Sequence, residues 1–147
     1  MESGQLKSPG FPNNYPNNKI CYWTITVPFG FSVTLDFETF EVSDDASLCQ
    51  YDYVEIRDGG DLTSKILGKF CGNTLPGSIR STGNQLFVKF HSDHSNQYKG
   101  FSASLTNGKN FFILRSNLFL NRIACNHNFV MTKDRKREHF RSQSFRW

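Results

Sequence analysis

Apolar and polar side chains alternate in several short runs between residues 21 and 105. In the run 33–38, for example, Val, Leu and Phe alternate with Thr, Asp and Glu. A period of two residues is typical of a β-strand with one buried face, and no helical period accompanies it. The runs that predict strands are 21–27, 33–38, 53–57, 66–70, 86–91 and 100–105. Because turn-forming Gly, Pro and Asn residues separate these runs, we predict an all-β antiparallel sandwich or barrel.

Residues 48–72 carry the densest set of structural signals in the chain. Two of the strand-like runs flank the turn DGGD at residues 58–61, and one cysteine stands at each end of the segment. This order predicts a β-hairpin with Cys49 and Cys71 at its two ends. Asp52 follows Cys49 by three residues, so we expect its carboxylate to lie beside these cysteines.

Composition and charge divide the chain in two. With 147 residues, including 15 Phe, 5 Tyr and 2 Trp, it is long enough for one aromatic-rich domain with a core. Residues 1–107 hold 8 Lys/Arg against 11 Asp/Glu, a net charge of −3, whereas residues 108–147 hold 9 against 2, a net charge of +7. This asymmetry predicts a domain at 1–107 followed by a basic, poorly ordered extension at 108–147.

The segment 4–105 resembles the CUB domain family. Six motifs occur in the family's order, and together they are specific although each alone is weak: SPGFPNNYPNN, CYWTITVP, CQYDYVEIRDG, GKFCG, STGNQLFVKFHSD and KGFSASL. The resemblance implies a jelly-roll-like β-sandwich of two antiparallel sheets. It also implies a non-enzymatic extracellular module that recognises another protein.

Four cysteines of the family form two local disulfides, the first with the second and the third with the fourth. Cys49 and Cys71 match the third and fourth, which implies a bond between them and an oxidising compartment. Cys21 matches the second, but no cysteine precedes it. Three alternatives stay open. The first, which we favour, is that the chain is truncated within its own domain; the others are that Cys21 is free or that it bonds to Cys125. The first residues show no signal peptide, and we expect a secreted protein or an extracellular part of a larger one.

Many CUB domains hold a Ca²⁺ ion at one end of the sandwich, where oxygen ligands from distant segments converge. The matching residues here are Tyr15, Asp52, Asp93, Ser95 and Asn96. Ser43 stands where the family carries a glutamate, and we expect Asp44, eight residues before Asp52, to take the place of that glutamate. The resemblance implies that these same six residues bind a basic side chain of a protein partner. The alternative is that the carboxylates are ordinary loop residues that cap turns.

The motifs do not support an enzyme. His91, Asp93 and Ser95 have the composition of a catalytic triad, but neighbours on one loop cannot all point at one substrate. Cys125 and His127 are two zinc ligands without a second pair at zinc-finger spacing. The sequence contains no P-loop, nucleophile elbow or dinucleotide-binding motif. The alternative link to catalysis is a regulatory or substrate-positioning domain of a secreted multidomain protease.

The segment 108–147 resembles no part of a CUB domain. Arg115 and Arg122 interrupt its apolar part, which argues against a membrane span. The cluster KDRKR at residues 133–137 can bind acidic polysaccharide, anionic lipid or nucleic acid. We expect a poorly ordered extension without a specific role, which continuation of an alternative transcript past the domain would explain. A nuclear import signal conflicts with the disulfide at Cys49–Cys71, and heparin-like carbohydrate is the alternative partner of this segment.

Overall fold

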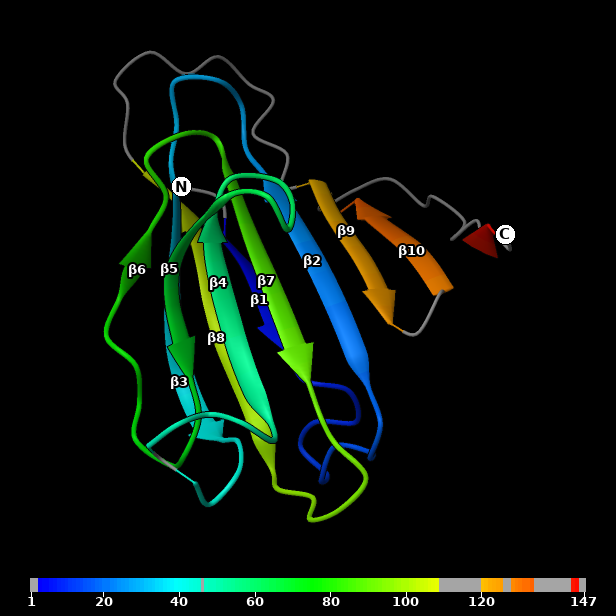
Figure 1. Ribbon diagram of the computed structural model, residues 1–147. Coiled ribbons are helices and arrows are strands. Elements are labelled where there is room, and N and C mark those ends of the chain that lie inside the picture. The colour runs from blue at the N-terminus through cyan, green and yellow to red at the C-terminus, as the bar shows by residue number, and fades with distance from the viewer. Residues whose placement is uncertain (1–2, 46, 109–119, 126–127, 134–143, 146–147) are drawn as a thin grey trace.

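The computed structural model describes residues 3–45, 47–108, 120–125, 128–133 and 144–145, which form two antiparallel sheets that pack face to face (Figure 1). The first sheet has the order β1 (Ser3–Lys7), β8 (Gly100–Asn107), β3 (Val33–Glu41), β6 (Ile79–Arg80). The second has the order β11 (Ser144–Phe145), β10 (Asn128–Lys133), β9 (Leu120–Cys125), β2 (Ile20–Thr26), β7 (Gln85–His91), β4 (Tyr53–Asp58), β5 (Lys65–Phe70). The predicted all-β, two-sheet sandwich is confirmed.

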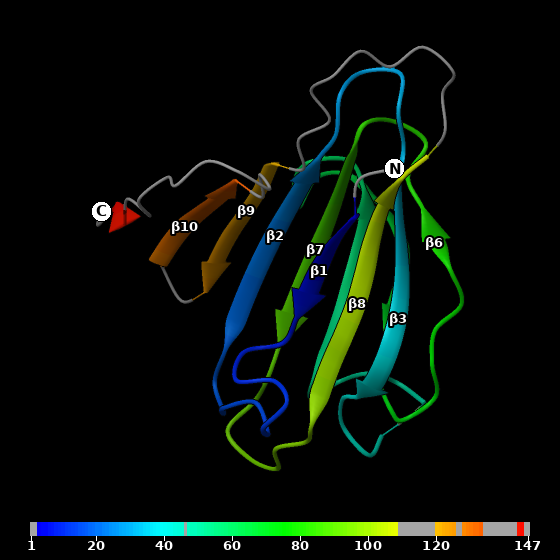
Figure 2. The ribbon, with the colours of Figure 1, turned by 180° about the vertical axis from the view of Figure 1, so that it is seen from behind.

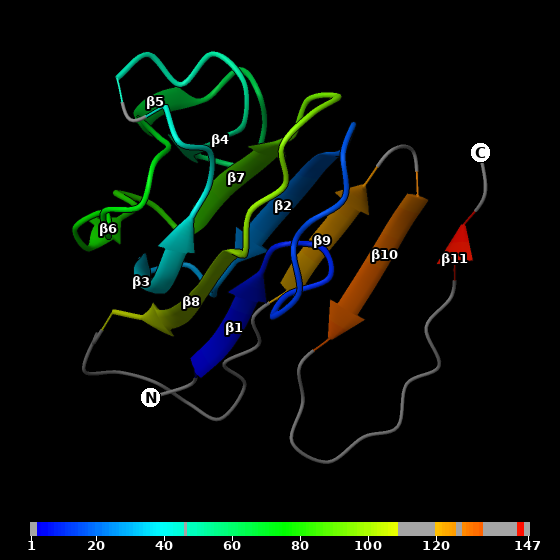
Figure 3. The same cartoon turned by 90° about the horizontal axis from the view of Figure 1, so that it is seen from below.

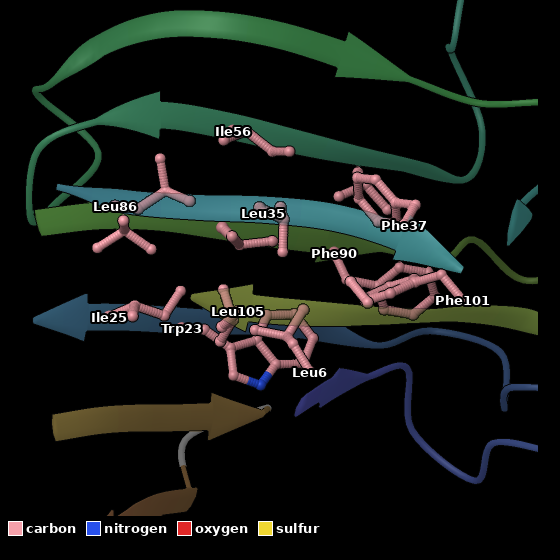
Figure 4. Close-up of a cluster of buried hydrophobic side chains, with 14 of the residues drawn as sticks. Leu6, Trp23, Ile25, Leu35, Phe37, Ile56, Leu86, Phe90, Phe101 and Leu105 are labelled. Atoms are coloured by element: carbon pink, nitrogen blue, oxygen red, sulfur yellow. The ribbon is translucent and has the colours of Figure 1, made fainter. Parts of the chain in front are cut away.

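The core lies between the two layers, which separate clearly when the molecule is seen from below (Figure 3). The inward-facing residues of the alternating runs fill it, among them Trp23 of β2 and Phe90 of β7 (Figure 4). Both rings contact Phe101 of β8 edge-on, with ring centroids 5.9 Å apart in each case. Full burial of one such side chain stabilises the fold by about 1.5–3 kcal/mol, so these cross-layer contacts hold the sheets together.

Each of the six predicted runs overlaps a strand, and the pattern misses β1 and β6 on the first sheet. Figure 2 shows this sheet from its outer side, with β1 at one edge. β1 and β6 carry no clear alternation of their own, and they are strands because β8 and β3 supply their hydrogen-bonding partners. Tertiary pairing therefore adds both elements to those that local pattern predicts.

Two disulfides occur in the structure. Cys49 bonds to Cys71, with the Cα atoms 5.4 Å apart, as the resemblance implies. Cys21 bonds to Cys125, with the Cα atoms 4.0 Å apart. These two cysteines lie directly opposite each other on the paired strands β2 and β9. Of the three alternatives for Cys21, the structure contains the bond to Cys125.

Part of the segment 108–147 pairs with the sandwich. β9 hydrogen-bonds to β2, and β10 and β11 follow it at the edge of the second sheet. Arg115, His127 and all of the KDRKR cluster except Lys133 lie outside the described residues, so the boundary near residue 107 and the order of the extension stay predictions. Among the residues that the structure describes, no helix has the length and apolar character needed to cross a membrane.

Candidate functional site

Two loops at one end of the sandwich surround a cavity of about 310 Å³, at the lower end of the molecule in Figure 1. Residues 42–52 connect β3 to β4, and residues 92–99 connect β7 to β8. The residues that line the cavity are Ser43, Asp44, Tyr51, Asp52, Asp93, His94, Ser95, Asn96 and Tyr98. The cavity therefore brings together most of the residues that the sequence predicts as calcium ligands.

Asp52 is the buried carboxylate of this cavity, with only 2% of its surface exposed. It directly precedes β4, and the Cys49–Cys71 bond holds the preceding loop. The Tyr15 hydroxyl donates a hydrogen bond of 2.6 Å to Asp52 Oδ2, and the backbone N–H of Asp93 donates one of 2.8 Å to Oδ1. Both carboxylate oxygens are thus held in place by donors from two distant segments.

Burial raises the pKa of the Asp52 carboxyl above its ordinary value, although the hydrogen bonds from Tyr15 and Asp93 N–H oppose the shift. The nearby Asp93 carboxylate raises the pKa further, because two negative charges repel each other. In the described part of the chain the only ion pair is Arg57–Glu55, which does not involve Asp52. Among the described residues, the buried Asp52 carboxylate therefore has no ion-pair partner.

Tyr15 connects the site to the hydrophobic core. It is fully buried, and its ring packs edge-on against Phe90 with centroids 5.0 Å apart. Burial, followed by the hydrogen bond to Asp52, raises the pKa of its hydroxyl, which stays a proton donor at physiological pH. Tyr15 does not line the cavity, so its contact with the site passes through Asp52.

The loop 92–99 is fastened to the turn that precedes β2. The Asn18 N–H donates to the Asp93 carbonyl at 2.8 Å, and the Asn17 side chain donates to the His94 carbonyl at 3.1 Å. Asp93 also accepts the Ser95 N–H at its Oδ1, at 3.1 Å. These bonds set the position of the DHSN segment beside Asp52.

Ser43 and Asp44 form the opposite wall. Ser43 has φ 68°, in the left-handed region, and its N–H donates to the Tyr15 hydroxyl at 3.3 Å. The position where the family carries a glutamate thus borders the cavity, but here it supplies only a hydroxyl. Burial, followed by a hydrogen bond to Asp44, raises the pKa of the Tyr98 hydroxyl. Asp44 and Tyr98 both line the cavity.

The donor atoms of this cavity fit calcium in kind. Ca²⁺ takes six to eight oxygen ligands, and Asp44, Asp52 and Asp93 offer carboxylates beside the oxygens of Ser95 and Asn96. Within the described residues, no three Asp, Glu, His or Cys side chains lie close enough together to hold a metal ion as they stand. The residues therefore fit the ion in the chemistry of their donor atoms, but their positions in this structure do not form a complete ligand set.

Sequence reasoning misses three residues of the lining, Tyr51, His94 and Tyr98. His94 lies within the DHSN run, and Tyr51 adjoins Asp52, so proximity to a predicted ligand is the signal that could have found them. Tyr98 carries no such signal, because its contact with Asp44 joins two loops that are far apart in sequence.

Comparisons with known proteins agree with this architecture. A family model described as "CUB domain" matches residues 1–105. The bone morphogenetic protein 1 homolog of Strongylocentrotus purpuratus is 47% identical over 102 residues, which are 69% of this chain and 16% of that protein. Bone morphogenetic protein 1 of Xenopus laevis is 46% identical over 103 residues, 70% of this chain and 14% of that protein. The chain thus spans only a small part of the length of these relatives.

Solved structures are similar over the same part of the chain. The MASP-1 CUB2 domain bound to Ca²⁺ is 36% identical with a TM-score of 0.64, and the match covers 71% of this chain and 92% of that one. The full extracellular region of zebrafish Gpr126/Adgrg6 is 42% identical with a TM-score of 0.63, and the match covers 71% of this chain and 13% of that one.

Proposed function

Because this chain belongs to the CUB domain family, whose members are non-catalytic interaction modules, we propose that it is an extracellular protein-recognition module whose acidic cavity binds Ca²⁺ and a basic side chain of a partner. One observation carries this proposal. Asp52 is a buried carboxylate without an ion-pair partner among the described residues, and it lines a cavity together with Asp44 and Asp93. The similarity to a CUB domain that is bound to Ca²⁺ supports it.

The proposed roles follow from the contacts. Asp44, Asp52 and Asp93 would hold the ion with their carboxylates, and Ser95 and Asn96 would add oxygens from the same loop. Tyr15 orients Asp52 through its hydroxyl. When bound, Ca²⁺ supplies the positive charge that this cluster lacks.

Carboxylate oxygens of the cavity that do not bind Ca²⁺ would accept hydrogen bonds from the partner. A lysine or arginine of the partner can make charge-assisted hydrogen bonds to carboxylate oxygens that are already held in place, which lowers the entropic cost of binding. Tyr51 lines the same cavity and is 54% exposed, so it offers an aromatic contact at the entrance. We place the partner's basic side chain between Tyr51 and the carboxylates.

A second candidate is a regulatory or substrate-positioning domain of a secreted multidomain protease. It is supported by the similarity to bone morphogenetic protein 1 and its homolog, of which this chain covers 14–16% of the length. The domains adjacent to this one in the full-length gene product would decide between the candidates.

Calcium binding is testable with a matched pair of variants. Asp93 and Asp61 each accept, at Oδ1, the N–H of the residue two positions on, at 3.1 and 2.9 Å, but Asp61 lies in the turn between β4 and β5. We expect wild type and Asp61→Asn to bind Ca²⁺ in isothermal titration calorimetry and Asp93→Asn to bind at least about 10-fold more weakly, because ligand charge sets affinity. At a free Ca²⁺ concentration of 100 times Kd, wild type should gain about 2.7 kcal/mol in free energy of unfolding.

Ser43→Glu adds a carboxylate to the cavity wall and is expected to tighten Ca²⁺ binding. A wild-type protein without a calorimetric signal or a thermal shift in Ca²⁺ would overturn the calcium site, as would equal affinity in the Asp93→Asn and Asp61→Asn variants.

A further inference from the structure

The outer side of the second sheet carries a row of charged residues across three strands, on the face turned toward the viewer in Figure 1. Glu55 of β4 lies directly opposite Lys69 of β5 and Lys89 of β7. Directly opposite residues of neighbouring strands share a face, and the residues on either side of Glu55, Val54 and Ile56, are fully buried in the core. The row Lys69–Glu55–Lys89 therefore faces outward.

The carboxylate of this row is already neutralised. Arg57 Nε donates to Glu55 Oε1 at 2.7 Å, and Arg57 Nη1 donates to the Ser64 carbonyl at 2.9 Å. Because this is the only ion pair among the described residues, neither Lys69 nor Lys89 has a carboxylate partner there. Two unneutralised ammonium groups thus lie on one sheet face.

Both ammonium groups gather at the ring of Tyr53. Lys69 Nζ lies 4.0 Å and Lys89 Nζ 5.4 Å from the ring centroid. The His91 ring stacks on the same tyrosine, with centroids 5.0 Å apart and an angle of 11° between the planes. Cation–π attraction holds the two ammonium groups near each other, and their mutual repulsion favours an anion that contacts both.

The uncovered part of this face has a clear border. The turn at residues 58–64 folds over the other half of the sheet, where the Thr24 hydroxyl donates to the Gly60 carbonyl at 3.0 Å. Gly59 permits this turn, since its φ is 151° and a side chain there would collide with that of Ser64. In the half that contains Tyr53, Lys69 and Lys89, Lys69 is exposed and the other two side chains are half-buried.

Charge complementarity indicates which class of ligand this surface binds. The first sheet is acidic along β3, which carries Asp36, Glu38 and Glu41, so an anionic chain is directed to the second sheet. An extended polysaccharide with repeated sulfate groups can contact the ammonium groups of Lys69 and Lys89 at once.

We propose that this surface, formed by Tyr53, Lys69, Lys89 and His91, is a binding site for a sulfated glycosaminoglycan. It lies on the outer face of the second sheet, and the contact of 2.7 Å between His91 Nδ1 and the Tyr51 carbonyl joins it to the loop that lines the acidic cavity.

The test measures binding of heparin to the full chain by calorimetry over a series of NaCl concentrations, in the presence of chelator. We expect Lys69→Gln/Lys89→Gln to bind at least about 10-fold more weakly than wild type and to show a shallower salt dependence. The matched control is Lys7→Gln/Lys99→Gln, which removes the same charge; Lys7 lies on the first sheet with its Nζ 5.9 Å from the Phe11 ring. This control should bind like wild type.

Two further measurements separate this site from other sources of affinity. Tyr53→Leu keeps the net charge and is expected to weaken heparin binding, because the ring that positions the ammonium groups of Lys69 and Lys89 is lost. Desulfated heparin and poly-glutamate should compete poorly. If the two double variants bind heparin with equal affinity, the affinity comes from overall charge and the proposal is overturned. If binding is lost only when Arg135, Lys136 and Arg137 are replaced by Gln, the C-terminal segment binds heparin, which also overturns the proposal. Equal competition by poly-glutamate would make the ligand an acidic peptide and likewise overturn it.

Discussion

At the scale of single residues, the Tyr15–Asp52 pair is the feature that distinguishes this cavity from an ordinary acidic loop. A surface carboxylate that caps a turn stays solvated, as Asp61 does in the turn between β4 and β5, where hydrogen bonds from Thr63 lower its pKa. The Asp52 carboxylate is instead shielded from solvent, and this burial raises its pKa. The fold thus holds this carboxylate at a cost in stability, which a bound cation would relieve.

The raised pKa predicts a specific pH dependence in chelator. The folded state binds the Asp52 proton more tightly than the unfolded state, so the contribution of Asp52 to stability is fully present below its unfolded pKa and is lost as pH rises through the folded pKa. Urea unfolding of wild type and Asp52→Asn over a pH series measures the contribution of Asp52 and its interaction with Asp93, because carboxyls that do not interact with Asp52 cancel in the difference. We expect the free energy of unfolding of wild type to fall relative to the variant as pH rises above the ordinary aspartate pKa. A difference that is constant over this range, or that grows with pH, contradicts the assignment.

At the scale of elements, β9 forms part of the second sheet and carries the partner of Cys21. Cys21 and Cys125 lie directly opposite each other on β2 and β9, and Cys125 packs against the core. The two cysteines are 104 positions apart, against 22 for Cys49 and Cys71. In the chain-entropy model a loop of about 100 residues gains about 4.7 kcal/mol from its crosslink, so the Cys21–Cys125 bond constrains the unfolded chain more strongly.

Cys125→Ser is therefore expected to lower the free energy of unfolding by about 4 kcal/mol in urea titrations. Cys21→Ser should cost a similar amount, and the double variant no more than either, because all three lose the same bond. Non-reducing peptide mapping of wild type should yield one linked peptide with Cys21 and Cys125. Labelling of Cys21 by a thiol reagent in the native wild-type protein would contradict the bond.

At the scale of the whole molecule, the order of the strands decides which edges are exposed. β2 lies between β7 and β9, so it is an inner strand of the second sheet (Figure 3). Without β9, its seven residues would form an edge with unpaired backbone groups. Such edges template association with other strands.

A chain that ends at residue 108, with Cys21→Ser to remove the free thiol, is expected to self-associate in sedimentation velocity through the exposed β2 edge. The full chain with Cys21→Ser/Cys125→Ser, which keeps β9, is the control and should stay less associated at equal concentration. A truncated chain that sediments like the control would show that β9 does not protect this edge.

The sequence by itself determines the strands and the chemistry of single positions. Alternation is a local property, so β2, β3, β4, β5, β7 and β8 follow from it, and Asp52 and the DHSN run at residues 93–96 can be identified from their motifs. Only the tertiary structure decides which distant residues meet. The bond from Cys21 to Cys125, the burial of Tyr15 beneath Asp52 and the row Lys69–Glu55–Lys89 all depend on strand register and on loop paths. The physical reason is that alternation sets which face a side chain occupies, whereas hydrogen bonding between strands far apart in sequence sets the neighbour that it contacts on that face.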